Sequence, residues 1–459
     1  MNKQKLLTFF FVLVLPLGVS RMVEQPALSA EPNTKGHPVI CGDFIQFPAF
    51  VGLDDAALDK HFAYLAEAGI EYLVLSGGVT QHVHRRYARM YYDSAIAQAN
   101  KSENFDQSHS TMMKRVLECC KKYKIKVYLN PLRKDGWWGP HYGRTNAQWH
   151  EAFIQDFAPL AQEIYDIFRE DYSDIIYGWY FEPEFYTYHQ TASQVSDMLN
   201  GFIRAINQVD DTMPFMFSPF FHKGDTDPKA VAAWWDSIFA KVNFRKGDIF
   251  CPQDSVGAGG AAIDTFANFY KELKPVVDQY PNLSLWSNPE SFKQSNWSSA
   301  PITRYVYQIQ AVSDYVDGYI SFAYSHYYAP TLGATAEKQK LHDSYLKYRK
   351  TGQIDFFNDI EIPAVGNITF SASANGVWVN VEVANSKNIV SHVDIYRGDT
   401  KIATVDVAPA DYSKDTMTVK YEDKDMTAAG TYTYKAVAYD FLLNASPEKS
   451  VSYQHVTNP

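Results

Sequence analysis

Residues 177–184 read YGWYFEPE, a short apolar run that ends in two acidic residues. Seven more apolar runs of this kind begin at positions 38, 72, 126, 215, 248, 283 and 318, and a helical pattern follows each of them. Apolar strands that alternate with helices form a parallel sheet that helices cover on the outside. Eight such units predict an α/β fold, a (β/α)8 or TIM barrel, over residues 36–350.

The pattern changes after residue 350. Residues 351–366 are predicted to form a linker, and residues 377–383 (VWVNVEV) place a valine at every second position. This period of two is typical of an antiparallel strand with one buried face. Residues 367–459 are therefore predicted to form a small C-terminal all-β domain. Within it, residues 430–446 (GTYTYKAVAYDFLLNAS) resemble the last hairpin of a fibronectin type III domain, a β-sandwich of the immunoglobulin kind.

The composition excludes several classes of protein. The chain has 459 residues, of which 46% are apolar and 20% charged, so it can bury a large core and is not disordered. Its formal net charge of −10 argues against a nucleic-acid partner, since phosphates are bound by basic side chains. The four cysteines are too few for a disulfide scaffold. Aromatic residues make up 15% of the chain, which suits both core packing and the binding of flat sugar faces.

The N-terminus has the pattern of a secretory signal peptide. Lys3 and Lys5 precede the apolar run 6–19 (LLTFFFVLVLPLGV), and small residues follow it. The run is shorter than the ~20 residues that span a bilayer as a helix. We predict that residues 1–30 form a signal peptide and leader, and that the mature protein is exported to the periplasm or beyond the cell without a transmembrane anchor. Cleavage after Ser20 and cleavage nearer Ala30 both fit the pattern.

Two of the predicted strands end in carboxylates. The fourth strand ends with Glu182-Pro183-Glu184, and the seventh ends with Asn288-Pro289-Glu290. In this fold, catalytic residues cluster at the carboxyl ends of the strands, so acids on the fourth and seventh strands can face each other across the mouth. Two converging carboxylates are the groups that glycoside hydrolysis needs. A single glutamate at a strand end is more often an ion-pair or capping residue, and it is the pair that favours catalysis.

Six stretches carry a resemblance to a known family. The chain resembles the exported, glycoside-hydrolase-like barrels called domain of unknown function 4434, and the matching stretches are GDFIQ (42–46), GWYFEPEF (178–185), FSPFF (217–221), CPQDSVG (251–257), LWSNPESF (285–292) and SHYYAP (325–330). The strand positions of the two acids also match the large clan of retaining glycoside hydrolases built on this barrel. The resemblance implies Glu184 as general acid/base and Glu290 as nucleophile. Phe181 stands where that clan has an asparagine before its acid, so Glu182 remains an alternative acid.

Further strand-end residues are candidates for binding the substrate. Asp254 could hydrogen-bond a sugar or a catalytic group, or instead cap the backbone of the glycine-rich turn at 257–260. Gln253 or Asn288 could replace the missing asparagine, and His326 is as fitting for a structural role as for a substrate contact. The full set of candidate binding residues is Gln46, Trp179, Gln253, Asp254, Trp286, Asn288, His326 and Tyr327.

Other motifs give weaker signals. His82 and His84 form a His-x-His pair without further ligands in register, so we expect no metal site. The glycines at 257, 259 and 260 lack the spacing of a dinucleotide fingerprint, and we expect no cofactor. The sequence therefore predicts an exported glycoside hydrolase that acts on a glycan or oligosaccharide. The alternatives are a glycan-binding barrel without catalysis and a structural surface protein, and the sequence leaves the sugar, its linkage and any protein partner open.

Overall fold

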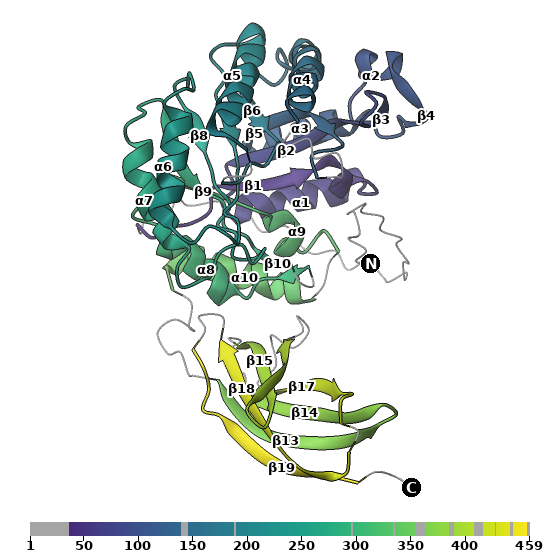
Figure 1. Ribbon diagram of the computed structural model, residues 1–459. Coiled ribbons are helices and arrows are strands. Elements are labelled where there is room, and N and C mark those ends of the chain that lie inside the picture. Colours follow the sequence, from purple (N-terminus) through teal and green to yellow (C-terminus); the bar gives the residue numbers. More distant parts are fainter. Residues whose placement is uncertain are drawn as a thin grey trace.

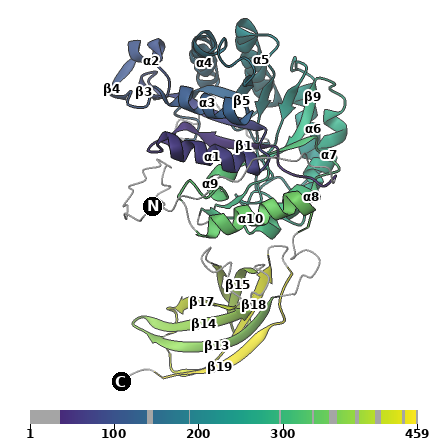
Figure 2. The ribbon, with the colours of Figure 1, turned by 180° about the vertical axis from the view of Figure 1, so that it is seen from behind.

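The computed structural model describes residues 36–138, 146–187, 190–294, 297–333, 336–353, 363–384, 390–407, 416–426, 428–440 and 444–456. The predicted signal peptide and most of the predicted linker lie outside these residues. The chain forms two bodies, a barrel and a smaller all-β domain that follows it (Figures 1 and 2). Within the described part of the chain, no helix combines the length and the apolar composition that crossing a bilayer requires.

The barrel is a closed parallel sheet of eight strands. Strand β1 pairs with both β2 and β12, so that Gly42 lies opposite Tyr72 on one side and Ile320 on the other, and the sheet closes on itself. This confirms the predicted (β/α)8 barrel. Its strands are β1 (Gly42–Gln46), β2 (Tyr72–Gln81), β5 (Lys126–Lys134), β6 (Ile176–Phe181), β7 (Phe215–Phe217), β8 (Asp248–Phe250), β9 (Leu283–Ser287) and β12 (Gly318–Ser321).

Helices surround the barrel (Figure 1). The first of them begins where the sequence predicts, because the Asp54 carboxylate accepts a hydrogen bond from the Ala57 N–H (2.8 Å) and caps the helix. The surrounding helices are α1 (Asp55–Glu67), α3 (Met112–Tyr123), α4 (Ala147–Phe168), α5 (Ala192–Val209), α6 (Pro228–Phe239), α7 (Ala267–Val277), α8 (Ile302–Ala311) and α10 (Ala336–Thr351). Short elements at the mouth are η1 (Phe47–Phe50), β10 (Phe292–Lys293), β11 (Ser298–Ser299) and α9 (Tyr324–Tyr327).

Alternate residues of each strand face two separate apolar layers. The inner layer fills the barrel and includes Phe44, Tyr128, Tyr180 and Met216. A side chain at Gly178 would meet the Tyr128 ring at 2.6 Å, so only glycine leaves room for that ring inside the barrel. The outer layer lies between strands and helices. Because side chains alternate with a period of two, residues 182 and 184 continue the inward set beyond the end of β6.

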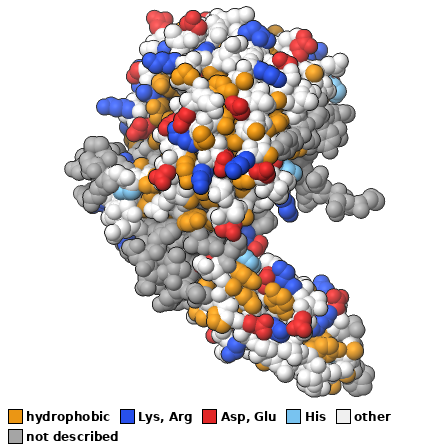
Figure 3. Space-filling view, turned by 60° about the vertical axis from the view of Figure 1, so that its left-hand side comes forward, with side chains coloured by type: hydrophobic (Ala, Val, Ile, Leu, Met, Phe, Trp, Pro, Cys, Tyr) orange, Lys and Arg blue, Asp and Glu red, His pale blue; other side chains and the backbone are white. Residues whose placement is uncertain are grey.

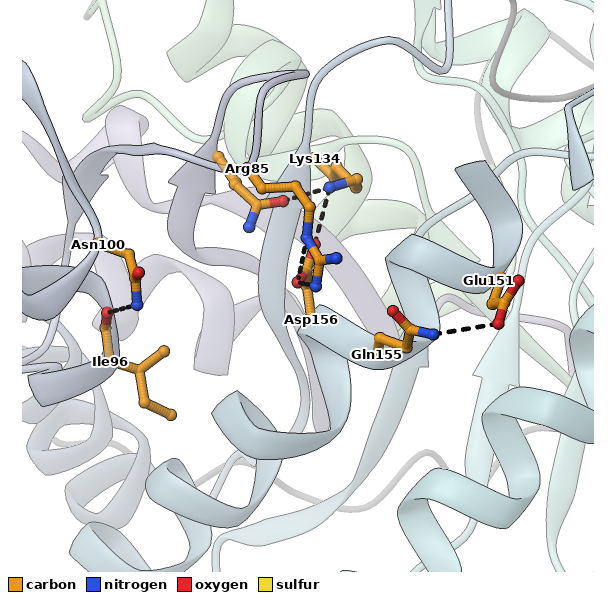
Figure 4. Close-up of polar contacts among 8 residues, drawn as sticks. Arg85, Ile96, Asn100, Lys134, Glu151, Gln155 and Asp156 are labelled. Atoms are coloured by element: carbon orange, nitrogen blue, oxygen red, sulfur yellow. Dashed lines mark hydrogen bonds and ion pairs between the residues drawn. The ribbon is translucent and has the colours of Figure 1, made fainter. Parts of the chain in front are cut away.

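An insert after β2 extends the sheet away from the barrel (Figure 1). It comprises β3 (Tyr87–Met90), α2 (Ala95–Ala99) and β4 (Lys101–Asp106). Figure 4 shows how α4 anchors it: the buried Asp156 carboxylate accepts from Lys134 Nζ (2.9 Å) and Arg85 Nε (3.0 Å), and Lys134 also donates to Gln81. Removing one partner of such a buried pair leaves a charge without compensation, which makes this network a strong attachment point.

The C-terminal domain consists of two antiparallel sheets. Val377, Val379, Val381 and Val383 are buried while Trp378 between them is exposed, which confirms the predicted alternation. Its fibronectin type III character stays a prediction. One sheet contains β13 (Ala364–Ser373), β14 (Gly376–Ala384) and β17 (Thr416–Asp423), and the other contains β16 (Thr400–Asp406), β15 (Val390–Arg397), β18 (Gly430–Asp440) and β19 (Lys449–His455).

One ion pair connects the two bodies directly. Lys293 Nζ on β10 lies 2.6 Å from the Asp406 carboxylate at the end of β16. The all-β domain therefore contacts the barrel at β10, the short strand that follows β9. On the face seen in Figure 3, acidic, basic and apolar side chains are interspersed over the barrel. That face therefore carries mixed charge.

Candidate active site

Two glutamates follow β6 and point into the mouth of the barrel. Glu182 and Glu184 are both partly exposed and belong to the inward-facing register. Glu182 is held by neighbouring strands, since Ser76 Oγ donates to its Oε1 (3.1 Å) and Asn130 Nδ2 to its Oε2 (3.0 Å). Burial raises the pKa of Glu182, whereas the positive charge of Arg133 and these two hydrogen bonds lower it. Glu182 is thus a carboxylate with a fixed orientation.

Glu184 has a different environment. Gln253 Nε2 donates to its Oε1 (2.9 Å), and Trp137 Nε1 donates to its backbone carbonyl (3.2 Å). Burial raises the pKa of Glu184 to about 7; the Gln253 hydrogen bond lowers this pKa, while the negative charge of Glu182 raises it. A carboxyl group with a pKa near neutrality can both donate and accept a proton at physiological pH. Glu184 therefore has the properties of a general acid/base.

Glu290 follows β9 on the opposite side of the mouth and is only 1% exposed. Its Oε2 accepts the backbone N–H of Ala258 (2.6 Å). A side chain at Gly257 would lie 3.0 Å from that Oε2 and 2.2 Å from the Phe292 carbonyl, so only glycine lets the turn approach this closely. Burial raises the pKa of Glu290, and the charges of Asp254 and Glu184 raise it further. Glu184 and Glu290 therefore share one electrostatic environment.

Asp254 is fully buried behind Glu290. Its Oδ1 accepts the backbone N–H groups of Val256 (3.1 Å) and Glu290 (3.3 Å), and its Oδ2 accepts Gln308 Nε2 (2.5 Å). The structure thus combines both roles considered for this residue, because Asp254 caps the turn and also fixes the backbone of Glu290. It has no exposed surface with which to touch a sugar.

Two amide side chains lie between the carboxylates. Gln253 donates from Nε2 to the Ser218 carbonyl (3.2 Å) as well as to Glu184, and Asn288 Nδ2 donates to Ser218 Oγ (2.9 Å). Asn288 is completely buried, whereas Gln253 is 8% exposed. Gln253 therefore contacts Glu184 directly, whereas Asn288 binds Ser218, the residue whose carbonyl holds Gln253.

The eighth and first strands contribute three more candidates. His326 Nε2 and Gln46 Oε1 lie 3.0 Å apart, and both side chains are partly exposed. Burial lowers the pKa of His326 to about 4, so its imidazole is neutral at physiological pH and can donate to Gln46. Tyr327 lies near Glu290, whose negative charge, together with burial, raises the pKa of the Tyr327 hydroxyl. The structure brings these residues to the same mouth as the carboxylates.

The barrel is similar in sequence to a known protein family. The family described as a domain of unknown function (DUF4434) matches residues 40–333. The chain belongs to the DUF4434 family. No curated protein matches the chain. Within the DUF4434 barrel, the matched segment contains every candidate residue named above.

Solved structures share the fold of this DUF4434 barrel. A protein from Bacteroides thetaiotaomicron designated a candidate α-L-fucosidase is 19% identical, with a TM-score of 0.55 over 73% of this chain and 99% of that chain. An endo-β-1,4-mannanase from Thermotoga petrophila is 12% identical, with a TM-score of 0.46 over 93% and 99% of the two chains. A glycoside hydrolase family 5 protein from Bacteroides vulgatus is 12% identical, with a TM-score of 0.41 over 81% and 87%. At 19% identity, the Bacteroides thetaiotaomicron structure supports the barrel fold and nothing more about this chain.

Two predicted binding residues lie away from the mouth of the DUF4434 barrel. Trp179 is fully buried in the outer layer, where its ring lies 6.2 Å from that of Phe157 on α4. Trp286 faces inward but lies at the closed end of the barrel, beside Tyr72 at the start of β2 (5.7 Å). Neither indole can stack on a sugar that reaches the carboxylates. Trp179 is therefore corrected to a core position, and Trp286 is corrected to a partly exposed position at the other end of the barrel.

Three residues that hold the site are absent from the predicted set. Ser76 and Asn130 bind Glu182, and Ser218 binds the two amide side chains. All three end apolar runs of the sequence, namely 72–76, 126–130 and 215–218, so their position at strand ends was a usable signal. The His82 imidazole lies 3.1 Å from Asp135 at the surface, and no group of three potential metal ligands occurs among the described residues.

Proposed function

We propose that this DUF4434 member is a glycoside hydrolase in which Glu184 and Glu290 act together on one glycosidic bond. The observation that supports this most directly is that β6 and β9 are each followed by a glutamate at the same mouth, where the charge of Glu184 is one of the causes that raise the pKa of Glu290. Paired carboxyl groups with separate protonation states are the working parts of glycosidases. The fold of the most similar structure reported above agrees with this assignment but does not carry it.

The strand positions of the two acids suggest their roles, because burial raises the pKa of both. Glu184, with its pKa of about 7, donates its proton to the glycosidic oxygen as the bond to the anomeric carbon breaks. Glu290 attacks that carbon through Oε1, because Oε2 is occupied by the Ala258 N–H. A covalent glycosyl ester forms and the leaving alcohol departs. Glu184 then takes a proton from water, the hydroxyl adds to the anomeric carbon, and Glu290 is released with net retention.

A second function follows from the burial of Glu290. A carboxyl group that is 1% exposed and has a raised pKa holds a proton more readily than an exposed one, and a protonated Glu290 cannot attack. In that case the same mouth recognises a glycan without cleaving it. The two functions differ in one measurable respect, which is whether a sugar that binds is also hydrolysed.

The experiment is hydrolysis of a panel of neutral glycans and aryl glycosides by the mature protein. We expect turnover by the wild type, by the folded control Glu151→Gln on the exposed face of α4, and by neither Glu184→Gln nor Glu290→Gln. Circular dichroism verifies that each variant is folded. Turnover that survives both substitutions would remove the site assignment, and binding without turnover would leave the glycan-binding function.

Export and the type of the C-terminal domain belong to the same proposal. The charged, apolar and small-residue order of residues 1–30 supports export to the periplasm or beyond. The alternating valines of β14 support a fibronectin-like module that spaces or docks the barrel. Mass spectrometry of the protein from fractionated cells tests the first point, since export requires a shortened N-terminus outside the cytoplasm.

A further inference from the structure

A row of four aromatic rings lies beside Glu184, and we call it the aromatic shelf: Trp138, Phe220, Tyr186 and His222. Ring centroids along the row are 5.8, 4.9 and 4.9 Å apart. Successive rings are inclined by 41°, 35° and 21°, so the rings lean against or stack on one another, with Trp138 and His222 at the two ends of the row. Trp138 follows β5, Tyr186 follows β6, and Phe220 and His222 follow β7.

The shelf is attached to the strand end that carries the acid. Trp137, next to Trp138, donates from Nε1 to the Glu184 carbonyl (3.2 Å). The Phe220 N–H donates to the Phe185 carbonyl (3.0 Å), and Phe220 also forms a β-bridge with Gln253. Gln253 in turn donates to Glu184. Three separate contacts therefore fix the position of the shelf relative to the Glu184 carboxyl group.

Exposure distinguishes the two adjacent tryptophans. Trp137 is 6% exposed and packs against Trp149 (5.3 Å) and Phe185 (5.7 Å), whereas Trp138 is 48% exposed. Trp138 therefore presents much of its ring to solvent beside the strand end that carries Glu184. Trp138 is the most exposed tryptophan among the described residues.

We propose that the aromatic shelf is a sugar-binding subsite in which the Trp138 indole stacks on the C–H face of a pyranose ring adjacent to the bond at Glu184. This inference rests on the proposed function of the same mouth. Glu182 lies at the same strand end, and its negative charge disfavours an anionic ligand when Glu184 holds its proton. The exposed Trp138 ring at the end of the row suits a flat neutral ring better than a quaternary ammonium group, which is bound by rings on several sides. The His222 imidazole at the end of the row offers a polar partner for a hydroxyl group.

A subsite beside the cleaved bond has a consequence for the substrate. The sugar on the shelf is a second unit, distinct from the one whose anomeric carbon meets Glu290. The substrate class is therefore a neutral oligosaccharide of at least two pyranose units rather than a monosaccharide conjugate with a small leaving group. Affinity should rise steeply from one unit to two or more.

The test measures binding separately from hydrolysis, in the Glu184→Gln protein. Gluco-, manno- and xylo-oligosaccharides of one to six units are titrated by calorimetry and by tryptophan fluorescence. We expect Trp138→Ala to weaken binding of oligosaccharides by about tenfold and to leave binding of monosaccharides unchanged, while Trp138→Phe retains part of the affinity. The matched control is Trp378→Ala, which removes an exposed indole from the all-β domain and should change neither.

Equal oligosaccharide affinity with and without the Trp138 indole would overturn the shelf, and so would absence of binding to the whole panel. The proposed function fails separately. If the panel binds in a Trp138-dependent way but the wild type cleaves none of it, the shelf stands and hydrolysis falls. If the wild type cleaves glycans and the Trp138→Ala variant cleaves them with the same KM, hydrolysis is supported and the sugar-binding role of the shelf is refuted.

Discussion

The two sides of the barrel mouth hold the same kind of residue in opposite ways. On the β6 side, Glu182 and Glu184 are partly exposed and are bound by side chains: Ser76, Asn130 and Gln253. On the β9 side, Glu290 is 1% exposed and is bound by a backbone N–H of a turn that its buried neighbour Asp254 caps. The β6 side is thus partly exposed and held by side chains, whereas the β9 side is buried and held by the backbone.

The difference teaches that protonation follows from surroundings rather than from residue type. Donors on the β6 side favour the ionised form and partly offset burial, which leaves the pKa of Glu184 at about 7. On the β9 side burial and the charge of Asp254 both raise the pKa of Glu290, and the Ala258 N–H and the positive charge of Arg304 oppose them. Substitutions on either side should therefore reveal how burial, hydrogen bonds and charges set the pKa of each glutamate.

The largest effect is expected for Glu290→Gln. Removing a nucleophile removes the covalent step, and we expect kcat/KM to fall by about 10⁴-fold or more for every substrate, whatever its leaving group. Steady-state kinetics on an aryl glycoside and on a natural glycan check this. A loss that depends strongly on the leaving group would instead assign Glu290 to proton donation and exchange the roles of the two sides.

Glu184→Gln should have a large effect that varies with the substrate. General acid catalysis contributes about 10²- to 10⁴-fold, and it matters most when the departing oxygen is basic. We therefore expect a full loss on glycans and a much smaller loss on aryl glycosides with acidic phenols. A uniform loss across a series of phenols of different pKa would contradict the assignment of Glu184 as acid.

The contrast between the two sides also shows what the sequence could reveal. The barrel and its acids were predictable, because eight apolar runs with helices between them leave few folds and each run ends at the same edge. Trp179 could have been placed correctly as well: a period of two that turns Glu182 and Glu184 inward turns position 179 outward. The environment of Trp179 is thus decided by its register in the strand rather than by its residue type.

Other features depend on geometry that the sequence does not encode locally. Trp286 faces inward like Glu290, but its depth follows from the tilt and stagger of strands around the closed sheet. The cradle over Glu290 needs Gly257 and a turn in which Ser255 adopts φ 59°. The burial of Asp254 by Gln308 brings together residues that are 54 positions apart. These contacts are set by the tertiary structure, and no sequence motif predicts them.

Gln253→Leu should shift the pH profile of the β6 side. In the wild type the Gln253 hydrogen bond stabilises the ionised form of Glu184. Its loss therefore raises the pKa of Glu184, and the alkaline limb of kcat/KM moves to higher pH by roughly one unit. The profile of wild type is the reference, and Gln155→Leu on the surface of α4 is the matched control. An alkaline limb that stays in place would mean that Gln253 does not govern the acid.

The pH dependence of the unfolding free energy measures the effect of burying Glu290 on the β9 side. Burial raises the pKa of Glu290 in the folded state above its ordinary value of 4.5, so its contribution to stability is fully present below pH 4.5 and is lost as the pH rises through the folded-state pKa. Each such group lowers the unfolding free energy by about 1.4 kcal/mol per pH unit in that window. We expect Glu290→Gln to flatten the decline, seen in denaturant melts from pH 5 to 8, more than Glu184→Gln does. Equal slopes would remove the difference between the two sides.

The smallest effect is expected for Glu182→Gln. Its orientation is set by Ser76 and Asn130, which an amide can still bind in part, and it takes no step in the proposed reaction. Its negative charge raises the pKa of Glu184, so the substitution should lower that pKa and move the alkaline limb to lower pH, opposite to Gln253→Leu. We expect kcat/KM at the optimum to stay within about tenfold of wild type, well short of the loss of a general acid. If Glu182→Gln instead shows the leaving-group dependence expected of Glu184→Gln, then Glu182 is the acid, and Gln253 holds a supporting carboxylate rather than the catalytic one.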